Sequence, residues 1–334
     1  MPMDVAQAVE QARTHIGREW GPLTLTIDPY WVRTFVESIE DPNPLWLDDD
    51  FARQTPWGGT VVPPTALCSL MARFRMRLRP ELDLEWGTET VNAGVHYALP
   101  NPIRSGDEIT CRFRMADLFS KVGRTGPLIF AVREQTLTNQ RGEEVLVGRQ
   151  ITAHYEGSGL AERRPMPSPQ RPSREASGAA SVWLDTVATG QLPQIGPGPS
   201  FAEVQVGQEM PEASRGPIRT RDQVKWAAST EDWDEIHYDY IYCRQVGMPD
   251  VISNGNFGYC ATAGRMLTDW LGTTGVLTAF STSYRTATYI GDTLTASGVI
   301  TATSEQDRTV DIQVTVRNQL GDTAVIGVAT ARLR

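Results

Sequence analysis

The residue pair best suited to chemistry in this 334-residue chain is a carboxylate and an imidazole five positions apart, Asp232 and His237. A turn of this length can direct both side chains to one point. Gly255 follows them and opens an apolar segment, which predicts a helix over residues 255–271 that starts beside that point. The first N–H groups of a helix have no intrahelical partner and attract negative charge. An acid–base pair beside such donors has the parts needed for proton transfer next to a carbonyl group.

A pair of this kind is common on surface turns, and it gains weight here because a degraded second copy lies earlier in the chain. Asp41 and Trp46 precede Asp232 and His237 by the same 191 positions. Two later turns correspond in the same order, with residues 105–107 matching 290–292 and residues 139–142 matching 318–321. Ordered agreement at a turn, a helix and two hairpins predicts an internal duplication.

Each copy predicts the same succession of elements. In the first copy an alternating strand at 23–27 precedes a short helix opened by Asp28 and Pro29, an acidic turn and a longer apolar helix. Strands follow at 109–115, 128–137 and 145–153. In the second copy Thr220 and Gln223 predict a capping box at the start of the short helix. One long helix laid on a curved antiparallel sheet satisfies this order and places the chain in the α+β class.

Composition limits the domain organisation and the partners. The chain divides into residues 1–156, a linker rich in proline, serine and glycine at 157–199, and residues 200–334. The net charge of −9 argues against nucleic acid or an anionic membrane as the main partner. The four cysteines and four histidines show no metal-ligand spacing. Since no apolar run of signal-peptide or transmembrane type is present, we expect a cytoplasmic protein.

With these motifs in place, the chain resembles the MaoC-like dehydratases, the (R)-specific enoyl-CoA hydratase or hydratase 2 family. The family signature is Asp, a variable residue, Asn, Pro, an aliphatic residue and His, followed by a glycine at the start of the central helix. Asp232, Ile236 and His237 match this signature. Asp234 stands where asparagine is usual, and Glu235 where proline is usual.

The first copy resembles the N-terminal half of fused members of that family. Its Asp41, Asn43, Pro44 and Leu45 match the signature, but Trp46 replaces the histidine. The resemblance covers nearly the whole chain outside the linker and implies a double hot-dog fold. In that fold each copy has a long central helix wrapped by a curved antiparallel sheet. Because an indole cannot exchange a proton as an imidazole does, we expect the first copy to be non-catalytic and its space to hold an acyl group.

The resemblance implies a hydro-lyase that adds or removes water across the C2–C3 double bond of a 2-enoyl thioester. Asp232 and His237 would activate the water, and the Gly255 N–H would stabilise the thioester oxyanion. We expect further substrate contacts from Asp234, Asn254, Asn256 and Trp46. Asn254 is also a residue type that often caps the start of a helix. No cofactor or metal is expected, since coenzyme A or a carrier-protein phosphopantetheine enters as part of the substrate. A homodimer of double hot-dogs fits the same resemblance.

Three alternatives stay open. The first is a dehydratase that acts on acyl-carrier-protein thioesters of a biosynthetic pathway. The second is a non-catalytic partner subunit that binds acyl thioesters, which Asp234, Glu235 and the lost histidine at Trp46 favour. The third is a thioesterase, since the hot-dog fold also hosts those enzymes; the intact Asp-x4-His pair argues against it.

Overall fold

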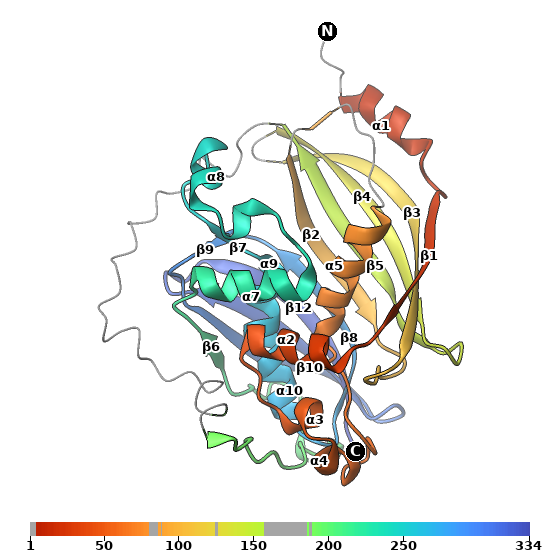
Figure 1. Ribbon diagram of the computed structural model, residues 1–334, viewed down its shortest axis with the longest axis vertical. Coiled ribbons are helices and arrows are strands. Elements are labelled where there is room, and N and C mark those ends of the chain that lie inside the picture. Colours follow the sequence, from red (N-terminus) through yellow and green to blue (C-terminus); the bar gives the residue numbers. More distant parts are fainter. Residues whose placement is uncertain (1–4, 80–85, 88, 124–125, 157–185, 187–188) are drawn as a thin grey trace.

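The computed structural model describes residues 5–79, 86–87, 89–123, 126–156, 186 and 189–334. Its centre is one ten-stranded antiparallel sheet (Figure 1). The first copy supplies β1 (Glu19–Thr26), β2 (Glu89–Ala98), β3 (Glu108–Gly123), β4 (Gly126–Thr138) and β5 (Glu144–Tyr155). The second copy supplies β6 (Ala213–Arg215), β8 (Val276–Tyr284), β10 (Leu294–Ser304), β11 (Thr309–Asn318) and β12 (Thr323–Arg332). A separate small ladder pairs β7 (Ile252–Ser253) with β9 (Thr288–Tyr289).

The strand order shows the duplication directly. It reads β1-β3-β4-β5-β2-β8-β12-β11-β10-β6, so both halves have the same order when followed outward from the β2–β8 junction. At that junction the pairing runs from Gly94 opposite Ser283 to Ala98 opposite Ala279. The predicted double hot-dog of the α+β class is therefore confirmed, and its two copies join edge to edge in one continuous sheet.

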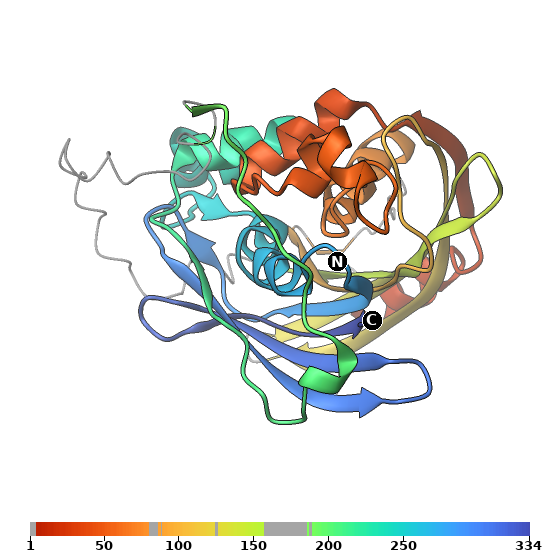
Figure 2. The same ribbon diagram turned by 90° about the horizontal axis from the view of Figure 1, so that it is seen from below.

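Most helices lie together on one face of the curved sheet (Figure 2). In the first copy they are α2 (Pro29–Ile39), α3 (Pro44–Leu47), α4 (Asp49–Arg53) and α5 (Ala66–Leu78). In the second copy they are α7 (Thr220–Thr230), α8 (Tyr240–Gln245), α9 (Gly255–Tyr259) and α10 (Arg265–Leu271). One further helix, α1 (Val5–Arg13), packs its buried alanines and Val9 against β3 and β4 in a separate small core.

The two short helices α2 and α7 pack against each other and tie the copies together. The Trp226 ring lies 5.9 Å from Phe35 and 5.8 Å from Phe257, measured between ring centroids. Trp31 donates its indole N–H to the carbonyl of Ser229 at 2.9 Å. These large buried side chains remove apolar surface from water, and the indole N–H of Trp31 is satisfied by its hydrogen bond. The acidic turn that follows each short helix is thus held on a rigid support.

The predicted helix over residues 255–271 is present, with one irregularity. It consists of α9, a π-helical segment η4 (Cys260–Gly264) and α10. The start of α5 crosses this segment so closely that a side chain at Gly264 would lie 2.6 Å from Thr65 Cγ2. Glycine is therefore required there, because any larger residue would push the two central helices apart.

Two expectations from the sequence need comment. The capping box of α7 is formed one residue earlier than predicted, since the Asp222 carboxylate accepts a hydrogen bond from Arg219 N–H at 2.8 Å. The predicted partner, Gln223, instead faces the interior and is fully buried. The predicted linker lies mostly outside the described residues, so its bounds stay a prediction. Among the residues described, no helix combines the length and apolar character needed to cross a membrane.

Candidate active site

Asp232 and His237 come together because the chain turns sharply after α7. Glu231 ends that helix in the left-handed conformation, with φ of 59°. The turn continues into the 3-10 segment η3 (Glu235–His237), which Asp234 caps by accepting the Ile236 N–H at 3.3 Å. Asn43 caps α3 in the first copy in the same way, at 2.9 Å from Leu45 N. The replacement of the usual asparagine by Asp234 therefore preserves the turn.

A single amide group joins the two predicted catalytic side chains. Asn254 Nδ2 lies 3.2 Å from Asp232 Oδ2 and 3.2 Å from His237 Nε2. An amide nitrogen carries two protons, so it can donate one to each neighbour. The carboxylate oxygen and the ring nitrogen are therefore at most two hydrogen-bond lengths apart and face the same point.

The backbone fixes the tautomer of His237. Its Nδ1 lies 2.9 Å from the carbonyl oxygen of Ile252, which can only accept a hydrogen bond. In the neutral ring the proton therefore sits on Nδ1, and Nε2 presents its lone pair toward Asn254. The backbone hydrogen bond of this histidine therefore occupies only Nδ1, and Nε2 is the nitrogen on the side of Asn254 and Asp232.

Asn254 is itself held on three sides. Its Oδ1 caps α9 by accepting the N–H groups of Asn256 and Phe257, at 3.0 and 3.4 Å. Its own backbone N–H donates to Gln223 Oε1 at 2.8 Å. Gln223 in turn donates to Ser253 Oγ at 3.2 Å. The side chain that bridges acid and imidazole is thus anchored to two helices at once.

Gly255 opens α9 directly beside this pair. Among the described residues none accepts a hydrogen bond from its N–H, as expected for the first residue of a helix. A side chain at this position would lie 2.9 Å from the Tyr284 ring. The Tyr284 hydroxyl donates to Asn256 Oδ1. Glycine is therefore needed at this position, because a larger residue would collide with the ring.

The electrostatics of the site involve both copies. Desolvation by the surrounding chain raises the pKa of the Asp234 carboxyl, and the nearby His237 ring opposes that rise. Arg75 reaches across from α5 of the first copy and places a guanidinium nitrogen 3.9 Å from Asp232 Oδ1. Its neighbours Arg73 and Arg77 are both paired with Glu231. Arg75 is therefore the cation of this helix that stays directed at the site.

The pair faces a cavity of about 830 Å³. Its second-copy wall includes Tyr284 and six predicted site residues: Asp232, Asp234, His237, Asn254, Gly255 and Asn256. Its first-copy wall is mainly apolar and comes from α5 and the sheet, through Cys68, Met71, Val95, Tyr97, Leu128, Phe130 and Ala153. A volume of this size accommodates a ligand as large as a long acyl chain with part of its carrier.

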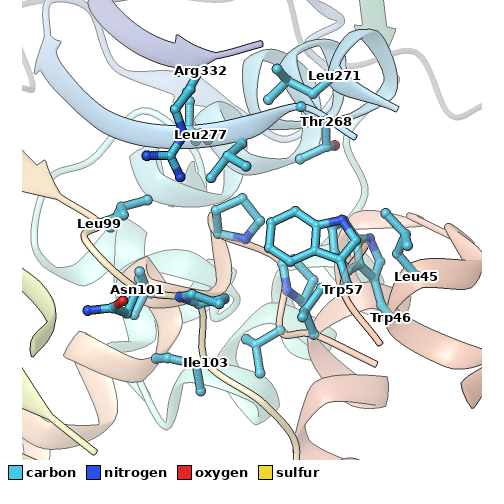
Figure 3. A pocket seen from close by; sticks show the side chains of 18 of the residues that line it. Leu45, Trp46, Trp57, Leu99, Asn101, Ile103, Thr268, Leu271, Leu277 and Arg332 are labelled. Carbon is cyan, nitrogen blue, oxygen red and sulfur yellow. The ribbon is translucent and has the colours of Figure 1, made fainter. Parts of the chain in front are cut away.

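Trp46, the remaining predicted substrate contact, lies elsewhere. Its indole N–H donates to Asp41 Oδ2 at 3.0 Å, so the two signature positions of the first copy are tied directly to each other. Burial raises the pKa of Asp41, and Arg265 of α10, 3.6 Å away, opposes that rise. Trp46 lines a different cavity of about 120 Å³, which we call the small chamber (Figure 3). The small chamber is lined by Leu45, Trp46, Trp57, Val61, Val62, Leu99, Asn101, Ile103, Thr268, Leu271, Val276, Leu277 and Arg332, with several prolines and glycines.

Three residues of the site were not predicted from the sequence: Arg75, Gln223 and Tyr284. Only Arg75 carried a usable signal. Arg75 and Arg265 are 190 positions apart, nearly the spacing of Asp41 and Asp232, so the duplication relates them. Each central helix lends its arginine to the aspartate of the other copy, an exchange that becomes visible only once the copies are placed side by side.

The fold and the site together define a double hot-dog protein. Its second copy has an acid–imidazole pair that opens onto a large cavity, and its first copy has Asp41 paired with Trp46 at the corresponding place. Two family models match the chain, the "FAS1-like, dehydratase domain region" over residues 14–147 and the "MaoC like domain" over residues 202–321. Between them they cover both hot-dogs. The C-terminal hot-dog thus carries a MaoC-like domain, and the N-terminal hot-dog matches a dehydratase domain region.

Individual relatives are distant in sequence. A UPF0336 protein of Thermobifida fusca (strain YX) is 26% identical over 137 residues, which are 40% of this chain and 87% of that protein. Among solved structures, a MaoC-like dehydratase aligns over 97% of this chain and 100% of its own, with a TM-score of 0.76 and 20% identity. A conserved hypothetical protein from Mycobacterium tuberculosis with a double hot-dog fold aligns over 95% of this chain and 96% of its own, with a TM-score of 0.63 and 16% identity. At sequence identities of 20% and 16%, the similarity to these two structures establishes the fold alone.

Proposed function

We propose that this protein adds water reversibly across the C2–C3 double bond of a 2-enoyl thioester, with Asp232 and His237 as the catalytic pair. The observation that carries this proposal is the convergence of the two side chains on one nitrogen of Asn254, beside the start of a helix and in the wall of an 830 Å³ cavity. The two family matches support a dehydratase, and this geometry supports the particular reaction.

The chemistry follows from the substrate. A thioester carbonyl withdraws electrons from C3, so a water oxygen can attack there while negative charge collects on the carbonyl oxygen. The Gly255 N–H would stabilise that oxygen, and one such donor is typically worth about 3–4 kcal/mol. The water sits on the cavity side of the Asn254 amide, between Asp232 and His237. One of the pair removes its proton, and a proton is delivered to C2, so that water is added without any other reactant.

The shape of the cavity supports a place for each part of the substrate. The apolar wall from the first copy suits the acyl chain, since α5 and β4 present Met71, Leu128 and Phe130 to it. Two cations that line this cavity, the half-buried Arg75 and the exposed Arg285, suit the negatively charged carrier arm. This arrangement fits coenzyme A and a carrier-protein phosphopantetheine alike, and no cofactor enters the scheme.

The test is a panel of 2-enoyl-CoA esters of increasing chain length, followed by loss of the conjugated-thioester absorbance. Asp232→Asn and His237→Ala should each lower kcat by roughly 10²–10⁴-fold, the usual share of acid–base catalysis. Glu235→Gln is the matched control, because this exposed acid lies on the same turn but does not line the cavity. Full activity in both site variants would refute the assignment.

The same panel separates the alternatives. Presenting each acyl group on a carrier protein as well as on coenzyme A identifies the preferred carrier from the ratio of kcat/KM values. A protein that binds enoyl-CoA but never consumes it on either carrier would be the non-catalytic subunit instead. Release of free thiol without loss of the double bond would indicate a thioesterase.

A further inference from the structure

The small chamber repeats the plan of the active cavity. Leu45 and Trp46 line it at the positions that Ile236 and His237 occupy in the active cavity, again 191 residues later. Residues 99–103 correspond to residues 284–288 with the offset of 185 that relates residues 105–107 to 290–292. The two cavities are therefore related by the duplication, and the small chamber is the place where a second active site would lie.

The sheet walls of the two cavities differ in charge at one pair of corresponding strand positions. In the first copy β2 pairs with β5 and places Val91 opposite Ala153. In the second copy β8 pairs with β12 and places Val276 opposite Arg332. These strand pairs correspond through the duplication, so the small chamber has an arginine where the active cavity has an alanine. No carboxylate of the described chain lies within ion-pair distance of Arg332.

The rest of the chamber wall is mainly apolar, and its polar side chains Asn101 and Thr268 already donate to the backbone carbonyls of Glu144 and Gly264. The indole N–H groups of Trp46 and Trp57 are already bound, to Asp41 Oδ2 and to the Thr273 carbonyl, each at 3.0 Å. Only the ring faces are left for a ligand. Figure 3 shows the Arg332 guanidinium beside Leu277 and Leu99 at the edge of this apolar space. Arg332 is exposed, so the cation reaches both solvent and the chamber.

We propose that the small chamber binds a short-chain aliphatic monocarboxylate. The carboxylate would pair with Arg332, whose planar guanidinium matches it in geometry. The chain would lie among Trp46, Trp57 and Leu271. A dry cavity of about 150 Å³ holds one benzene molecule, so the 120 Å³ of the chamber suits a chain of about four carbons. This binding is independent of the reaction proposed for the active cavity.

The test is a calorimetric titration of the full-length protein with butanoate, with tryptophan fluorescence as a second signal from Trp46 and Trp57. A ligand of six heavy atoms should bind with a Kd of roughly 1 mM. Arg332→Ala restores the residue of the active cavity and should weaken binding at least about tenfold, as should replacing butanoate by uncharged butanamide. Arg334→Ala, an exposed arginine outside the chamber, should leave the Kd unchanged.

Two results would overturn the proposal. One is the absence of saturable binding up to about 20 mM butanoate, well beyond the expected Kd. The other is binding that Arg332→Ala and the amide leave unaltered, which would place the ligand in another part of the protein. Because Arg332 is exposed at a strand end, its replacement should fold normally, and an unchanged thermal unfolding midpoint verifies this.

Discussion

Replacing Asn254 by serine separates two tasks that its side chain performs. Its Oδ1 caps α9, whereas its Nδ2 joins Asp232 to His237. Serine caps helices about as well as asparagine, since its hydroxyl also accepts a hydrogen bond from the first turn. It has no group that can reach both catalytic side chains. Asn254→Ser should therefore keep the helix and lose the bridge.

The size of each effect follows from the contacts. Both Nδ2 distances are 3.2 Å, the long end of the hydrogen-bond range, so neither bond is strong. A hydrogen bond to a charged group is worth about 1.5–3 kcal/mol, which corresponds to roughly 10- to 150-fold in rate if orientation of the pair limits the reaction. The unfolding free energy should change by less than about 0.5 kcal/mol, because the cap is retained.

The assay is hydration of the enoyl thioester that the wild type consumes fastest, with thermal unfolding measured on the same samples. Asn254→Ala is the matched comparison, since it removes cap and bridge together and should also lose about 1 kcal/mol of stability. Asn254→Asp keeps the cap but sets a second carboxylate against Asp232, and its kcat should fall further than that of the serine variant. Wild-type kcat in Asn254→Ser would show that the amide bridge has no part in catalysis.

Three further predictions test the surroundings of the site. Arg75→Gln should lower kcat about five- to tenfold, because it removes a partly exposed ion pair, with 3.9 Å between guanidinium nitrogen and carboxylate oxygen, that orients Asp232 and is worth about 1 kcal/mol. An unchanged kcat would argue against this role. Trp46→Phe should lower the free energy of unfolding, measured in urea, by about 1–3 kcal/mol, because buried Asp41 loses its hydrogen-bond donor. The same variant should keep the wild-type kcat if the first copy is non-catalytic. Burial lowers the pKa of His154 to about 4, so the folded protein keeps this ring neutral while the unfolded chain takes up a proton below about pH 6.5. As pH drops from about 6.5 to 4, the unfolding free energy of the wild type should therefore fall by on the order of 3 kcal/mol more than that of His154→Asn. Plots of unfolding free energy against pH, measured by chemical denaturation, that run parallel for the two proteins would contradict this.

The parts of the site that the sequence predicts are those encoded locally. The turn from Asp232 to His237 and the helix start at Gly255 depend on residues close to one another in the chain, and the structure places both as expected. The bridge through Asn254 was not predicted, because a cap and a catalytic contact look the same in sequence. Arg75 belongs to the other copy, so its approach to Asp232 depends on how the two halves pack.

The two cavities show what fusion of the copies makes available to this fold. A dimer of identical hot-dogs would have two equal sites, because each site would use the central helix of its neighbour in the same way. Here one cavity measures about 830 Å³ and its counterpart about 120 Å³, although the scaffold around them keeps its symmetry and the exchange of Arg75 and Arg265. The asymmetry lies in side chains, with Trp46 closing one site and the first-copy sheet widening the other. Since the first copy forms the apolar wall of the large cavity and does not supply its acid or its imidazole, substitutions there can alter which ligand fits while Asp232 and His237 stay in place.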